Sequence, residues 1–145
     1  MISNEKHFLK LEHMYLSAPV NQYYAPAIHI SEGQAQVTIP IRPDFFHAAN
    51  AVHGAVYFKL LDDSAFFAAS SLVKDVFVLT VSYNVYFMRP VSAGVMKATG
   101  RIVQASLRLI VAESVVVDSE EREIARGSGT FIRSMIKLTE EIGYK

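Results

Sequence analysis

The sequence contains no cysteine, which excludes disulfide bonds, thiolate nucleophiles and zinc sites built on cysteine. It also lacks an excess of charge of either sign, because 14 Lys and Arg balance 14 Asp and Glu. This balance gives no electrostatic reason to expect a nucleic acid or an anionic membrane as a partner. No apolar run is long enough to span a bilayer, since even residues 107–117 are interrupted by Arg108 and Glu113.

The first residues lack the basic start and apolar run that mark a secretory signal, so the expectation is a cytoplasmic protein. Hydrophobic residues make up 51% of the 145 residues, which favours a folded domain over a disordered chain. We predict a single domain over residues 1–145, with a short N-terminal helix at about residues 4–16 and a core at about residues 27–134.

The most informative stretch covers residues 51–70 and predicts a long apolar helix that begins at His53-Gly54. Apolar residues fill most of its turns, so the helix is expected to be largely enclosed. Two adjacent carboxylates, Asp62 and Asp63, lie near its middle, and an enclosed carboxylate is costly unless it is paired, hydrogen-bonded or used in chemistry. A glycine at a helix start presents backbone N–H groups to an oxyanion. The combination suggests acyl chemistry.

The rest of the chain predicts an α+β fold in which an antiparallel sheet wraps the one long helix. A loop is expected between Pro19 and Pro26, and Glu32-Gly33 is a plausible hairpin turn. The short connections after the long helix predict an antiparallel meander. One helix cannot cover the edges of such a sheet, so self-association is expected. The six predicted strands cover residues 27–31, 34–41, 76–88, 94–105, 107–118 and 124–133.

Four motifs follow one another between residues 34 and 134. They are the His53-Gly54 helix start, the acid nine positions after that histidine, the strand over residues 79–90, and a closing segment from Gly100-Arg101 through residues 124–131. In order and spacing they resemble the hotdog-fold acyl-CoA thioesterases of the phenylacetate-degradation (PaaI-like) type. The resemblance implies a hotdog fold, hydrolysis of acyl- or aryl-CoA thioesters to the free acid and CoA, and a homodimer or homotetramer. It implies no metal and no cofactor, because CoA is part of the substrate.

The same resemblance implies roles for single residues. The Gly54 N–H would polarise the thioester carbonyl, and Asp62 would act as nucleophile or general base. Thr80 falls where the family often has a Ser or Thr that positions the attacking water, and His53 would shape the start of the helix.

At three positions the chain departs from the family pattern. His47 stands where the family usually has an Asn or Gln that helps hold the carbonyl, and Asn50 stands where it usually has a glycine. Ala55 replaces the second glycine of the common His-Gly-Gly. Either His47 or Asn50 could supply the missing side-chain donor.

Arg89, Arg101 and Arg108 are candidates for the phosphates of CoA, since that ligand carries several negative charges, and Lys137 is a fourth. Asp63 lies about 100° further round the helix than Asp62, so it is expected to be partly solvated or paired at an interface. The remaining histidines, His7, His13 and His29, are expected to be solvated.

Three other functions fit parts of the sequence. A hotdog hydratase or dehydratase would pair a histidine with an acid, and His47 keeps that open, although a His-Phe-Pro motif is absent. A non-catalytic acyl-CoA-binding module would explain the departures at His47, Asn50 and Ala55. A metal site built from His47, His53 and the two acids is the weakest of the three, because no ligand spacing is defined.

Overall fold

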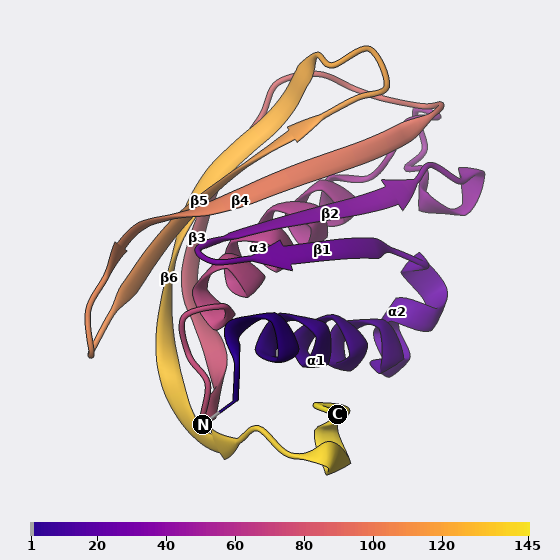
Figure 1. Ribbon diagram of the computed structural model, residues 1–145. Coiled ribbons are helices and arrows are strands. Elements are labelled where there is room, and N and C mark those ends of the chain that lie inside the picture. The colour runs from indigo at the N-terminus through magenta and orange to yellow at the C-terminus, as the bar shows by residue number, and fades with distance from the viewer. Residues whose placement is uncertain (1) are drawn as a thin grey trace.

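The computed structural model describes residues 2–145, and Met1, with which the predicted domain begins, lies outside the described residues. Two helices and two strands precede the long helix, and four consecutive strands follow it, which confirms the predicted α+β class (Figure 1). In chain order its elements are α1 (Asn4–Ser17), α2 (Pro19–Tyr24), β1 (Ala27–Ser31), β2 (Gln34–Pro40), a 3-10 turn (Pro43–Phe45), α3 (Gly54–Ser70), β3 (Val76–Phe87), β4 (Val95–Ala105), β5 (Ile110–Val117), β6 (Glu123–Lys137) and a second 3-10 turn (Glu140–Ile142).

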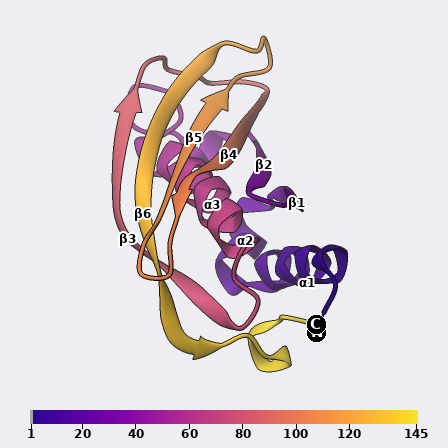
Figure 2. The ribbon, with the colours of Figure 1, turned by 60° about the vertical axis from the view of Figure 1, so that its left-hand side comes forward.

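The strands form one antiparallel sheet of six in the order β1-β2-β4-β5-β6-β3. Figure 2 shows that the sheet curves around α3, with α1 on the side of the molecule away from β6. The predicted arrangement, a sheet wrapped around one long helix, is confirmed. The predicted hairpin turn is also confirmed, since Ser31 pairs with Gln34 and Gly33 takes a φ of +70° that suits glycine.

The predicted meander after the long helix is wrong at its first step. β3 pairs with β6 at one edge of the sheet, and only β4, β5 and β6 form a meander. The segment between β3 and β4 contains Pro90 and crosses one end of the fold. There its backbone bonds to other loops, because Val52 N donates to Val91 O and Ile41 N donates to Gly94 O. These bonds take the place of a tight hairpin turn.

The loop predicted between Pro19 and Pro26 is in fact the short helix α2. Pro19 lies in its first turn, where a proline needs no N–H donor, so this residue begins a helix here. The strand β5 starts at Ile110, three residues later than predicted, because Ser106 and Leu109 close a turn through their backbone and the Ser106 hydroxyl.

The helix α3 packs tightly on the inner face of the sheet. Leu60, Leu61 and Ala65 are fully buried, and Gly100 of β4 approaches so closely that a Cβ there would lie 2.2 Å from the Ser64 carbonyl. One stripe of the helix is left uncovered, and it carries Ala55, Phe58 and the half-buried Asp62 at a spacing of three and four residues. No helix within residues 2–145 is long and apolar enough to cross a membrane.

The N-terminal helix is fastened to the end of α3 and to the C-terminal segment by His7. The prediction that His7 is solvated is wrong, because it is 0% exposed. Its Nε2 donates to Ser70 O at 2.9 Å, so Nδ1 is left to accept from the Tyr144 hydroxyl at 2.7 Å. His13 and His29 are exposed as predicted. The buried position of His7 comes from contacts 63 and 137 residues away, which no local pattern reveals.

Candidate active site

The start of α3 is formed by His53, the N-cap residue, which has an extended backbone. Its Nδ1 accepts a hydrogen bond of 2.9 Å from the Ala55 N–H, so the imidazole satisfies one of the donors left free at a helix start. Gly54 is the first residue of the helix, and its N–H has no acceptor one turn earlier in the helix. A backbone donor at the positive end of a helix suits a polarised carbonyl.

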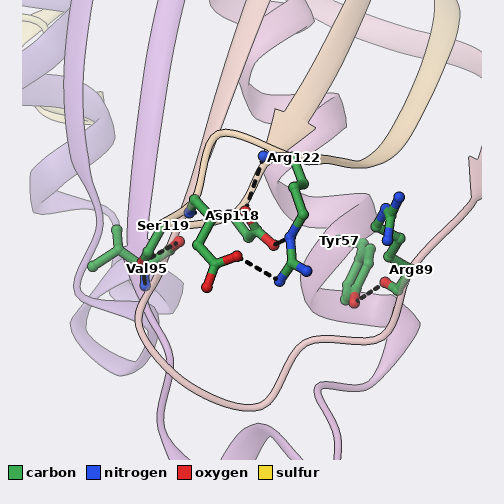
Figure 3. A network of polar contacts seen from close by, with 7 residues as sticks. Tyr57, Arg89, Val95, Asp118, Ser119 and Arg122 are labelled. Carbon is green, nitrogen blue, oxygen red and sulfur yellow. Dashed lines mark hydrogen bonds and ion pairs between the residues drawn. The ribbon is translucent and has the colours of Figure 1, made fainter.

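A cavity of ≈430 Å³ lies beside this helix start. Gly54, His47, Tyr57, Phe87 and Arg89 are among the residues that line it. The Tyr57 hydroxyl donates to the Arg89 carbonyl at 2.7 Å, which ties the segment after β3 to the first turn of α3 (Figure 3). The sequence prediction placed Gly54 and His47 in one site, and the structure brings them to one cavity.

A polar network at the turn between β5 and β6 lies close to this tie, as Figure 3 shows. The buried Asp118 accepts from the Arg122 N–H at 3.0 Å, from Arg122 Nε at 2.9 Å and from the Glu120 N–H at 2.9 Å. These bonds, the Arg122 backbone donor foremost, lower the pKa of Asp118. The Ser119 hydroxyl accepts from the Val95 N–H at 2.9 Å, which links the turn to the start of β4. The network and residues 90–93, which follow Arg89, line one hollow.

His47 and Asn50 occupy the loop before α3, and both are exposed. His47 Nδ1 accepts from the Ala49 N–H at 3.0 Å, and its ring lines the cavity beside Gly54. Asn50 has a φ of +63°, a left-handed conformation that asparagine and glycine adopt most readily. Its backbone therefore explains an asparagine where the family usually has a glycine. Which of the two side chains holds a carbonyl stays a prediction.

Asp62 lies on the uncovered stripe of α3 and faces β3. The Thr80 hydroxyl donates to its Oδ1 at 2.8 Å, so the two residues singled out in the sequence are in direct contact. Burial raises the pKa of Asp62 to about 6, against the Thr80 hydrogen bond, which lowers it. The charge of Asp63 raises it further and that of Lys59 lowers it. A carboxyl that loses its proton near pH 6 can serve as a base near neutral pH.

Asp63 points away from Thr80 and toward the N-terminal helix. Its Oδ2 accepts from the Tyr15 hydroxyl at 2.6 Å and from Lys59 Nζ at 2.8 Å. Asp63 was expected to be partly solvated or paired at an interface; it is 17% exposed, and its partners lie within its own chain. Asp62 and Asp63 therefore have different hydrogen-bond partners, as their 100° separation on the helix requires.

A second cavity, of ≈390 Å³, lies between α3, β3 and the N-terminal helices. Its polar lining includes Asp62, Asp63, Thr80 and Lys59, and most of the remaining wall is apolar. A carboxylate at the edge of an apolar hollow matches the needs of an acyl or aryl substrate. The apolar lining includes Met14, Val20, Phe66, Phe67, Phe77, Leu79 and Ile142.

The three arginines proposed for CoA lie in different parts of the molecule. Arg89 lines the cavity beside Gly54, whereas Arg101 lies on the outer face of the sheet in a hollow it shares with Arg126. Arg108 is exposed in the turn between β4 and β5, and Lys137 is the last residue of β6. Within one chain, therefore, only Arg89 is close to a predicted catalytic residue.

Sequence reasoning missed Tyr15 and Lys59. Lys59 precedes Asp63 by four residues, a spacing at which opposite charges meet on a helix, so this pair could have been found. Tyr15 reaches Asp63 from 48 residues away and has no local signal. Nowhere in residues 2–145 do three His, Asp or Glu side chains gather as metal ligands would, and His47 and His53 bind backbone N–H groups through Nδ1.

Comparisons with known proteins identify the family and the fold of the chain. A family model described as the thioesterase superfamily matches residues 49–125. A protein of Thermoplasma volcanium, provisionally named an esterase, is 23% identical over 103 residues, which cover 71% of this chain and 77% of the relative. A second provisional esterase, from Saccharolobus solfataricus, is 22% identical over 104 residues, or 72% of this chain and 74% of the relative.

Solved structures show the same fold. The E. coli PaaI protein of the phenylacetic acid degradation operon superposes with a TM-score of 0.85 at 20% identity, covering 94% of this chain and 99% of that one. A thioesterase family protein of Silicibacter pomeroyi superposes with a TM-score of 0.81 at 23% identity, covering 90% and 97%. The predicted hotdog fold is therefore confirmed.

Proposed function

The chain belongs to the thioesterase superfamily, and from this premise we propose that it hydrolyses acyl- or aryl-CoA thioesters to the free acid and CoA. Asp62 is the group that carries the reaction. It activates the attacking water as a general base, or it attacks the thioester carbon itself and water then releases the acyl group. The carbon–sulfur bond breaks and CoA leaves with a proton on its sulfur.

One observation carries this proposal: a half-buried carboxyl with a pKa of about 6 receives a hydroxyl hydrogen bond at the edge of an apolar cavity. Thr80 would hold the attacking water beside Asp62, and the cavity would accept the acyl or aryl group. Gly54 would supply the N–H that stabilises the developing oxyanion, with His53 fixing the helix start and His47 or Asn50 as side-chain donor.

The oxyanion donor and the acid must come from different subunits. Gly54 and Asp62 are eight residues apart on one straight helix, which separates them by about 12 Å at about 1.5 Å per residue. A reacting carbon needs both groups within about 3 Å. Two antiparallel α3 helices across a two-fold axis would place Gly54 of one subunit opposite Asp62 of the other.

Two uncovered surfaces support such a dimer. The stripe of α3 that carries Asp62 also exposes 40% of Phe58. The edge strand β3 exposes 58% of Val81, 67% of Tyr86 and 57% of Phe87. An unpaired strand edge can pair with another chain, and a large exposed apolar patch marks an interaction surface. We propose a homodimer, or a homotetramer of two dimers.

CoA is part of the substrate, and we propose no further cofactor. Arg89, in the Gly54 cavity, is the arginine best placed to meet its phosphates. Arg101 and Arg108 lie further away within one chain, so they could serve only a site formed with another subunit. A cytoplasmic location stays a prediction from the sequence.

A thiol-release assay across short, medium, long and aromatic acyl-CoAs tests the proposed reaction. We expect thiol release that Asp62→Asn lowers by about 100-fold or more, while Asp63→Asn costs much less. Circular dichroism controls for folding. Equal loss from both substitutions, or a greater loss from Asp63→Asn, would contradict the assignment of Asp62.

The same assay distinguishes the alternatives. A change in enoyl absorbance without thiol release would indicate a hydratase or dehydratase. Binding of acyl-CoA with neither signal would indicate a non-catalytic module. Either result would overturn the proposed hydrolysis.

A further inference from the structure

We propose that Tyr15, Asp63 and Lys59 form a positioning cluster for the active site, in which the balance of the Asp63 and Lys59 charges sets the pH range where Asp62 can react. The inference rests on the proposed function of Asp62 and adds residues that do not touch the reacting atoms. These residues would regulate the active site by changing the pH range in which Asp62 reacts.

The geometry of the cluster is fixed from three sides. The Tyr15 hydroxyl and the Lys59 ammonium both bind Asp63 Oδ2, at 2.6 Å and 2.8 Å. The Lys59 ammonium also lies over the rings of Tyr15 and Tyr24, at 5.4 Å and 4.9 Å from their centroids. The side chains of Lys59 and Asp63 are only 12% and 17% exposed, so solvent screens their charges less than those of surface residues.

Asp62 shares a cavity with all three members of the cluster. The titratable or charged groups that face it are Asp63 and Lys59 from its own helix, Tyr15 from α1 and Tyr83 from β3. Both tyrosines stay protonated near neutral pH, because burial raises the pKa of each, that of Tyr83 to about 12. The only full charges in this set other than that of Asp62 are therefore those of Asp63 and Lys59.

These two charges act on Asp62 in opposite directions. The negative charge of Asp63 disfavours ionisation of Asp62 and so raises its pKa, whereas the positive charge of Lys59 lowers it. The Tyr15 hydroxyl and the Lys59 ammonium both bind Asp63 Oδ2, which fixes the position of the negative charge of Asp63 relative to Asp62. The cluster therefore holds two opposite charges at fixed positions beside Asp62.

The test uses variants that remove one charge at a time. The activity of each variant is measured as a function of pH. In Asp63→Asn the rise of activity on the acidic side is expected to move to lower pH by about one unit. In Lys59→Met it is expected to move to higher pH by a similar amount. The double variant should return close to the wild-type profile. Asp75→Asn and Lys97→Met are matched controls, because neither residue lines the Asp62 cavity. Comparing profiles rather than rates keeps the test valid if a variant folds less well.

A titration of the Asp62 side-chain carboxyl by ¹³C NMR provides a readout independent of activity. Opposite shifts of its pKa in the two single variants support the cluster. Shifts in the same direction, or none beyond those of the controls, overturn it. If the NMR shifts are opposite but activity does not depend on Asp62, the proposed reaction fails and the electrostatic role of the cluster stands. If the NMR shifts are absent while Asp62→Asn abolishes activity, the cluster fails alone.

Discussion

At the scale of single residues, Asp62 is held in an environment that costs the fold free energy. Its ordinary pKa of 3.8 rises to about 6 in the folded chain, with burial as the largest cause. Between these values the folded state keeps a proton that the unfolded state has lost. Stability therefore falls as pH rises from about 4 to about 6, and it stays lower above that range.

Asp62→Asn is accordingly expected to stabilise the protein at pH 8 by about 1 to 2 kcal/mol, after allowing for partial solvent screening. At pH 4, where Asp62 is protonated in the wild type, the gain should vanish. Chemical denaturation at both pH values measures this. Asp63→Asn should instead lower stability, because it leaves Lys59 without its charged partner. An equal gain from Asp62→Asn at pH 4 would show that the charge is not the cause.

Only some of the contacts around Asp62 and Asp63 could be predicted from the sequence. Roles for Asp62 and Thr80 in one site were expected from the family resemblance, and the structure joins the two side chains by a hydrogen bond of 2.8 Å. The partners of Asp63 were not, because the Tyr15 contact depends on how α1 packs against α3. The spacing of motifs can be read directly from the sequence, whereas the packing of α1 against α3 exists only in the folded protein.

At the scale of elements, the position of α3 on the sheet depends on the small size of Gly100. A Cβ at this position would lie 2.2 Å from the Ser64 carbonyl carbon and oxygen, which are backbone atoms and cannot rotate away. Gly100→Ala should therefore push the helix off β4 and destabilise the protein by about 1 to 3 kcal/mol. Thr99→Ala, on the other face of the same strand, is the control. Thermal denaturation of both variants measures the difference, and equal small losses would contradict the close packing.

The docking of α1 is expected to weaken in mild acid. Burial lowers the pKa of His7 below its ordinary 6.5, so the unfolded state binds a proton in a range where the folded state does not. The His7 contribution to stability is full above pH 6.5 and is lost as pH falls below it. Hydrogen exchange of α1 amides, corrected for intrinsic rates, should show falling protection from pH 7 to pH 5.

A substitution tests the same contact at constant pH. Tyr144→Phe removes the hydroxyl that donates to His7 Nδ1 and should lower the protection of α1 by about 1 kcal/mol. Tyr23→Phe removes a hydroxyl that donates to the Asp44 carbonyl rather than to His7, and it serves as the control. Unchanged protection in Tyr144→Phe would show that α1 is held by its apolar contacts alone.

The identity of most elements could be predicted from the sequence, but the partner of β3 could not. Alternation and turn residues identify a strand, whereas its neighbour depends on where the connection crosses the fold. Here the bonds of Val52 to Val91 and of Ile41 to Gly94 carry the chain from one edge of the sheet to its middle. The loop predicted after Pro19 was wrong because a proline can begin a helix as well as a loop.

At the scale of the whole molecule, the shared site gives a prediction about mixed dimers. Gly54→Pro should delete the backbone donor while remaining compatible with the first helical turn, and Asp62→Ala should delete the acid. Each variant alone should be nearly inactive. Co-expression should restore about a quarter of wild-type activity, because with random pairing about half the dimers are mixed and half of their sites are intact.

The control for this experiment is proof that mixed dimers form, for example by two different affinity tags. No recovery in proven mixed dimers would mean that both groups act within one chain or that Gly54 is not the donor. Light scattering that shows a monomer at micromolar concentration would contradict the assembly itself.

The family match and the wall of the Asp62 cavity belong to different parts of the chain. The match spans residues 49–125, which include Gly54, Asp62 and Thr80, whereas Met14, Tyr15 and Val20 on the opposite wall precede it. If the proposed site is correct, natural selection can alter which acyl group is accepted by changing α1 and α2 while the reacting groups stay as they are. Relatives that catalyse the same reaction on different substrates would then differ first in the amino-acid sequences of their N-terminal helices.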